Sequence, residues 1–97
     1  MPSYILLMTY TDEGLRNIKY LPQHVSAVRQ AVESAGGRLP SIYLTMGQYD
    51  LVAILEAPDD KVCASISLGL SSLGNVRSTT LKAFGEDELT EVVGNIP

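Results

Sequence analysis

The chain has 97 residues, a length that suits one small domain with a single hydrophobic core. Apolar residues make up 45% of the sequence and charged residues 19%, which excludes the composition of a disordered segment. The formal net charge is −4 and no run of Lys or Arg occurs, so neither a basic nucleic-acid surface nor a nucleic-acid partner is predicted.

The N-terminus and the single cysteine indicate a cytoplasmic protein. Residues 1–8 lack a basic leader, and their apolar run is too short for a membrane span, so neither a signal peptide nor a membrane partner is expected. Cys63 is the only cysteine, which excludes an internal disulfide, and no metal-binding spacing is present. We expect one continuous domain over residues 1–97, without a metal or a cofactor.

The first elements are a strand and two consecutive helices. Residues 3–10 have the length and composition of a strand, and both of its faces are largely apolar. A short helix up to Tyr20 follows, with Thr11 or Asp12 as its cap. Pro22 fits the first turn of a longer helix. The apolar stripe of that helix, which ends at two glycines, consists of Leu21, Val25, Val28, Val32 and Ala35.

A β-hairpin is predicted next. Residues 39–46 alternate between polar and apolar side chains, and Pro40 indicates that this strand begins irregularly or lies at an edge of the sheet. Gly47 allows the chain to reverse, and residues 50–56 form the returning strand. Five consecutive apolar residues, 51–55, lie in that strand, so both of its faces require cover.

A second long helix and a last strand complete the pattern. A helix is expected to start at residues 58–60, where the carboxylates of Asp59 and Asp60 stabilise its positive N-terminal end, and to stop at residues 74–75. Its apolar side consists of Val62, Ile66, Leu70 and Leu73. Residues 76–84 form the last strand, and residues 86–97 form a C-terminal helical tail.

The resulting β-α-β-β-α-β order predicts an α+β protein with a ferredoxin-like, four-stranded antiparallel sheet. The spatial order 4-1-3-2 places the first and third strands in the centre, and these are the two strands with two apolar faces. Two helices can cover only one face of this sheet. The other face would expose either Leu51, Ala53 and Leu55 or Val52 and Ile54.

An uncovered apolar sheet face predicts self-association. Each large aliphatic side chain contributes about 1.5–3 kcal/mol when it is fully buried, and a contiguous exposed patch normally marks an interface. We therefore predict a two-fold homodimer that packs sheet against sheet. Two alternatives stay open. The tail of residues 86–97 could fold over this face within one chain, and copies could form a higher homo-oligomer.

Several segments together resemble the signature of the GYD domain family. They are Tyr4–Leu7, Thr11–Gly14, Leu44–Asp50, Glu56–Asp60 and Ser72–Leu81, and Gln48 stands between Gly47 and Tyr49. The match covers almost the whole chain. The resemblance implies the dimeric α/β-barrel version of the ferredoxin-like fold, and it implies no particular chemistry.

Four residues are candidates for a ligand site. Arg77 and Thr79 share one face of the last strand, and a guanidinium could bind a carboxylate or a phosphate there. Arg77 could instead form an ion pair with an acidic residue. Tyr49 and Asp50 could form a polar pair at the mouth of a pocket. The alternative, which we favour for these two, is that Asp50 caps turn amides and Tyr49 packs over the end of the sheet.

His24 and Cys63 are weaker candidates. His24 is the only histidine and no catalytic partner is evident, so a solvated helix position is favoured. Cys63 lies near a helix start, but its apolar neighbours favour a buried, inert thiol.

Three functions fit these features. The first and favoured one is a small-ligand binding module with a regulatory or accessory role, for which anions are among the candidate ligands. The second is a cofactor-independent enzyme, such as a monooxygenase or an isomerase, by analogy with other dimeric α/β barrels. It would require a cavity with a titrating group at its wall. The third is an interaction subunit of a larger assembly. No catalytic residue is identified.

Overall fold

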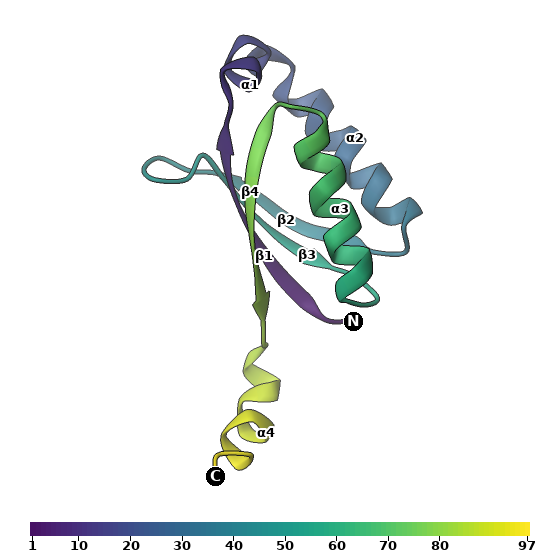
Figure 1. Cartoon of the computed structure of the whole chain (residues 1–97), viewed down its shortest axis with the longest axis vertical. Helices are drawn as coiled ribbons and strands as arrows, with labels where there is room; N and C mark the ends of the chain where they lie inside the picture. Colours follow the sequence, from purple (N-terminus) through teal and green to yellow (C-terminus); the bar gives the residue numbers. More distant parts are fainter.

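The computed structural model describes all 97 residues and contains the predicted elements in the predicted order (Figure 1). In chain order they are β1 (Ser3–Tyr10), α1 (Asp12–Arg16), η1 (Ile18–Tyr20), α2 (Leu21–Ser34), β2 (Arg38–Leu44), β3 (Leu51–Glu56), α3 (Asp60–Ser72), β4 (Val76–Ala83), η2 (Glu86–Glu88) and α4 (Leu89–Gly94).

The four strands form one antiparallel sheet in the order β2-β3-β1-β4, which confirms the predicted ferredoxin-like arrangement read from the opposite edge. At the centre of the sheet, Leu6 of β1 faces Ala53 of β3 and Thr80 of β4. The register of edge strand β2 shifts between Arg38 and Ser41. Pro40 lies at this shift, where its missing N–H costs no ladder hydrogen bond.

Helices α2 and α3 cover one face of the sheet and leave the other face uncovered (Figure 1). The alternating residues of the two central strands that face the helices form most of the core: Tyr4, Leu6, Met8, Leu51, Ala53 and Leu55. The residues between them are only half-buried: Ile5, Leu7, Val52 and Ile54. The sequence left open which alternate residues of β3 face away from the helices. In the structure these residues are Val52 and Ile54, and Leu51, Ala53 and Leu55 face the helices.

Helix α1 closes one end of the helix-covered side by packing against the turn between α3 and β4. The Thr11 hydroxyl accepts a hydrogen bond from the Gly14 N–H and donates one to the Gly74 carbonyl, so Thr11 is the cap of α1. Gly14 is buried at this contact. A Cβ atom on Gly14 would lie 2.0 Å from the Asn75 carbonyl oxygen, so only glycine fits.

The C-terminal segment extends away from the body of the molecule (Figure 1). Residues 85–97 are exposed, and α4 does not cover the open face of the sheet. The radius of gyration is 14.5 Å. A compact domain of 97 residues would have about 12.5 Å. The exposed apolar side chains of this segment are Leu89, Val92, Val93 and Ile96.

Candidate functional site

Arg77 and Thr79 lie on the uncovered face of the sheet. In the β1–β4 register, Arg77 pairs with Thr9, and Thr79 pairs with Leu7. Side chains alternate along β1, so Leu7 and Thr9 lie on the same uncovered face as Ile5. Arg77 is exposed and takes part in none of the three ion pairs of the chain. The guanidinium is therefore available to an anion or to another copy of the chain.

Asp50 fastens the β2–β3 hairpin to the central strand β1. Its Oδ2 accepts a hydrogen bond of 2.8 Å from the Tyr10 N–H, and its own N–H donates to the Met8 carbonyl at 2.9 Å. The Asp50 carbonyl also accepts from the Thr45 N–H at 2.8 Å. One oxygen of the carboxylate is thus engaged by a backbone amide, and that amide belongs to the neighbouring strand rather than to the turn.

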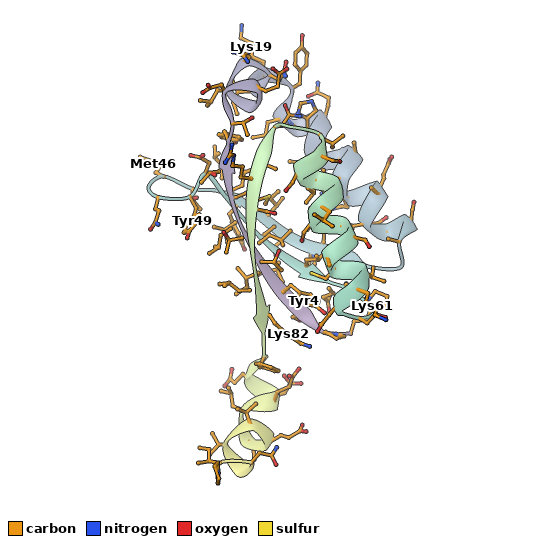
Figure 2. The ribbon with its side chains drawn as sticks, in the orientation of Figure 1. Tyr4, Lys19, Met46, Tyr49, Lys61 and Lys82 are labelled. Atoms are coloured by element: carbon orange, nitrogen blue, oxygen red, sulfur yellow. The ribbon has the colours of Figure 1, made fainter.

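Tyr49 belongs to the loop that leads into β3. Its carbonyl accepts a hydrogen bond of 2.6 Å from the Thr45 hydroxyl, and its side chain is partly buried. In Figure 2, Tyr49 lies near the base of this protruding loop and Met46 lies at its tip. Met46 is fully exposed.

The structure brings the polar candidates to the same level of the sheet. Asp50 bonds to Met8 and Tyr10, the two neighbours of Thr9, and Arg77 pairs with Thr9 from the other side. Asp50 and Arg77 thus flank β1 with backbones roughly 10 Å apart, two strand spacings. Their side chains form no ion pair with each other. A ligand between them would have to span β1.

A second candidate site lies on the opposite side of the sheet, in a groove between α2 and α3. The groove has a volume of about 490 Å³, and 19 of its 25 lining residues are hydrophobic. Its floor is formed by β1 and β3, and no Asp, Glu, Lys or Arg side chain lines it. This size is within the usual range for sites that bind small molecules.

Two polar atoms of this groove have no hydrogen-bond partner. They are the Tyr10 hydroxyl and the Asn75 Oδ1, and both are buried. Burial raises the pKa of the Tyr10 hydroxyl, and the negative charge of Asp50 raises it further. Sequence reasoning missed the groove. The available signal was the small residues on the facing sides of the helices, Ala27, Ala31, Ser65 and Gly69, which leave space between them.

A polar cluster at the start of α3 has a structural role. The Tyr4 hydroxyl donates a hydrogen bond to Asp60, and Lys82 Nζ forms an ion pair with the same carboxylate at 2.9 Å (Figure 2). The bond to Asp60 raises the pKa of Tyr4 to about 12, and the bonds from Tyr4 and Lys82 lower the pKa of Asp60. The cluster therefore ties α3 to both β1 and β4.

His24 and Cys63 occupy different surroundings. His24 lines the groove and stacks at an angle near Tyr20, with ring centroids 6.4 Å apart. Cys63 is buried, and burial raises the pKa of its thiol, which disfavours the reactive thiolate. Leu73 was predicted in the buried stripe of α3, but it is 67% exposed because α3 ends beside it.

Comparison with known proteins agrees with the signature segments and with the sheet order. The family model of the GYD domain matches residues 4–93. The chain belongs to the GYD domain family. None of its helices is both long and apolar enough to cross a membrane.

Two relatives from Thermus thermophilus resemble this GYD protein. One, named "Glutamine synthetase and cystathionine beta-lyase binding protein", is 37% identical over 85 residues, which cover 87% of this chain and 90% of the relative. The other is a protein of known crystal structure, with a TM-score of 0.56 and 25% sequence identity. The match covers 88% of this chain and 95% of the neighbour, and it supports the ferredoxin-like arrangement.

Proposed function

We propose that this GYD protein is an accessory binding protein that works as a homodimer and binds a metabolic enzyme. The observation that carries the proposal is the relative named for binding glutamine synthetase and cystathionine beta-lyase, which aligns with nearly the full length of this chain. The extent of this alignment supports a shared mode of action. The enzymes of the source organism that correspond to these two are therefore the first partners to test.

The uncovered sheet face supports the homodimer. Ile5, Leu7, Val52 and Ile54 are adjacent across β1 and β3, and no element of their own chain covers them. Ile5 pairs directly with Ile54, and Leu7 pairs with Val52, so the four side chains form one continuous patch. A second copy placed sheet against sheet would remove this patch from water on both molecules.

The extended C-terminal segment supports the same assembly. Leu89, Val92 and Val93 of α4 are exposed, and the helix makes no substantial contact with the strands or long helices of its own chain (Figure 1). In the proposed dimer, α4 packs on the other copy, where its apolar side chains find the cover that they lack here.

We also propose that Arg77, with Thr79, Tyr49 and Asp50 around it, binds a small anion at the boundary between the two copies. The free guanidinium of Arg77 supports this role, because a rigid fork of donors suits a carboxylate or a phosphate. The second copy would supply the other wall of the site. Such a ligand could adjust the assembly and hence the accessory function.

Binding of purified enzymes tests the main proposal. The full-length protein is immobilised, and glutamine synthetase and cystathionine β-lyase from its source organism are each passed over it in biolayer interferometry. The control is an acidic enzyme that is similar in size to these two enzymes and belongs to an unrelated pathway. We expect saturable binding of at least one of the two enzymes and none of the control. Binding of neither enzyme at micromolar concentration would overturn the enzyme-partner proposal.

Light scattering coupled to size exclusion tests the assembly separately. We expect the mass of two chains at micromolar protein concentration. A stable species with the mass of one chain, 10.5 kDa, would overturn the dimer. The two measurements are independent, since a monomer could still bind an enzyme and a dimer could fail to bind one.

A further inference from the structure

The groove between α2 and α3 is an independent site on the face of the sheet that the proposed dimer does not use. We infer that it binds a neutral, largely apolar small molecule whose head group both donates and accepts a hydrogen bond, as in an alcohol or a primary amide. The inference is independent of the enzyme partner and of the sheet-to-sheet contact of the dimer, because the groove and the uncovered face lie on opposite sides of the sheet.

The lining of the groove selects for an apolar body. Its volume is about 490 Å³, and its floor and walls are formed by aliphatic side chains such as Leu6, Val28, Val32 and Ile66. No carboxylate, ammonium or guanidinium lines it. Besides Tyr10, the one titratable side chain in the lining is His24, so a charged head group placed beside Tyr10 and Asn75 and away from His24 would lose its hydration without gaining an opposite charge.

Two buried polar atoms without hydrogen-bond partners favour a head group that both donates and accepts a hydrogen bond. The Tyr10 hydroxyl and the Asn75 Oδ1 are buried without a hydrogen-bond partner, which is unusual in a folded protein. Tyr10 pairs with Val76 across β1 and β4, and Asn75 is the residue before Val76. Both groups therefore belong to the same end of the groove.

The chemistry of this pair is complementary to that of an alcohol or an amide. The Tyr10 hydroxyl stays protonated because burial and the nearby Asp50 raise its pKa, so it can donate to a ligand oxygen. The Asn75 oxygen can accept from the ligand hydroxyl or amide N–H. Both atoms are covered in the free protein, so the side chains of Tyr10 and Asn75 would turn toward the groove to bond to a head group, and the apolar body of the ligand would extend away from them along the groove.

The packing of α1 gives this end of the groove a fixed shape. Gly14 lies against the Asn75 backbone, and the Thr11 N–H donates to the Asn75 carbonyl at 3.1 Å. The backbone that carries the Asn75 amide is therefore held in place before a ligand arrives. Such preorganisation lowers the ordering cost of binding.

Three ligands with the same chain and different heads test the inference. 1-Decanol is titrated into the full-length protein below its solubility limit, decanoate and decyltrimethylammonium are titrated below their micelle concentrations, and methyl NMR spectra report where each one binds. We expect 1-decanol to shift the methyl signals of Val32 and Leu70 in the groove and to leave those of Val52 and Ile54 unchanged. We expect the two charged ligands to bind at least tenfold more weakly. Equal affinity for all three, or shifts on the uncovered face, would overturn the inference.

Tyr10→Phe separates a ligand role from a structural role. If the hydroxyl is unpartnered in the free protein, its removal should leave the melting temperature unchanged or raise it slightly. The affinity for 1-decanol should fall by about three- to tenfold, the loss of one hydrogen bond. A lower melting temperature with unchanged affinity would assign the hydroxyl to the fold and overturn the inference.

Gly69→Leu blocks the groove without disturbing its walls. Gly69 lines the groove, and a Cβ atom at this position meets nothing within 4 Å. The variant should fold and lose 1-decanol binding, while Gly94→Leu, equally unhindered but in α4, should bind normally. If α4 of another copy occupies the groove instead, wild-type protein will not take up 1-decanol and Gly69→Leu will dissociate the dimer. That result would also overturn the inference.

Discussion

The two faces of the sheet use the same strands for different contacts. On the face toward the helices, Leu6, Ala53 and Leu55 are almost completely buried within one chain. On the opposite face, Ile5 and Ile54 pair across the strands and remain without cover. The polar atoms also differ, because the covered side holds two neutral groups without partners and the uncovered side carries the free charge of Arg77. A β-strand can therefore supply an internal core and an external interface by alternation alone.

The largest expected effect concerns the uncovered face. Ile54→Glu would place a charge in the middle of the apolar patch, and a two-fold dimer would bury two such charges. Each isoleucine contributes about 1.5–3 kcal/mol on burial, so the dimer should weaken by roughly 3–6 kcal/mol or more. Sedimentation velocity should then find single chains at concentrations where the wild type is dimeric.

Leu68→Glu is the matched control for that variant. Leu68 is 72% exposed on α3, on the other side of the sheet, and it does not line the groove. The control should remain dimeric and fully folded. Dissociation of both variants to the same extent would contradict an interface confined to the uncovered face.

The covered face can be disturbed through Gly14. In Gly14→Ala, the added Cβ atom would clash with the Asn75 carbonyl, and both are backbone-anchored, so neither can move alone. Overpacking of this kind costs about 1–3 kcal/mol, and we expect the upper part of that range in urea unfolding. The control is Gly94→Ala, where the new methyl group meets nothing. If the free energy of 1-decanol binding decreases by more than the free energy of unfolding, α1 contributes to the shape of the groove end.

The proposed anion site gives a smaller effect. Arg77→Met keeps the length of the side chain and removes its charge. Calorimetry with inorganic phosphate should show an affinity at least about tenfold lower, since a hydrogen bond to a charged group contributes about 1.5–3 kcal/mol. Unchanged phosphate binding together with a lost dimer would assign Arg77 to the interface and remove its ligand role.

Much of the fold could be predicted because it depends on local pattern. The strand of residues 3–10 was predicted with its observed bounds, and Pro40 correctly marked an edge strand. The sequence of residues 51–55 could not show which face of this strand the helices cover, because the side chains on both faces are apolar. That choice depends on where the helices pack.

The site was harder to predict because it depends on contacts distant in sequence. The sequence correctly grouped Arg77 with Thr79 on one strand face, but it could not assign that face. Asp50 was interpreted as a cap for turn amides, whereas its partner is the Tyr10 amide, 40 positions away. The groove requires the spacing between α2 and α3, which no local periodicity reports.

The smallest expected effect is the pH dependence of the Tyr4–Asp60 contact, which ties α3 to the covered face. Folding raises the pKa of Tyr4 from 10.0 to about 12, so the folded state holds this proton more tightly than the unfolded chain does. The resulting stabilisation is fully present below pH 10 and is lost as the pH rises toward about 12. The melting temperature of the wild type should therefore fall more steeply over this interval than that of Tyr4→Phe. Other groups that lose protons there are common to both proteins, so parallel curves would show that Tyr4 does not couple its proton to folding.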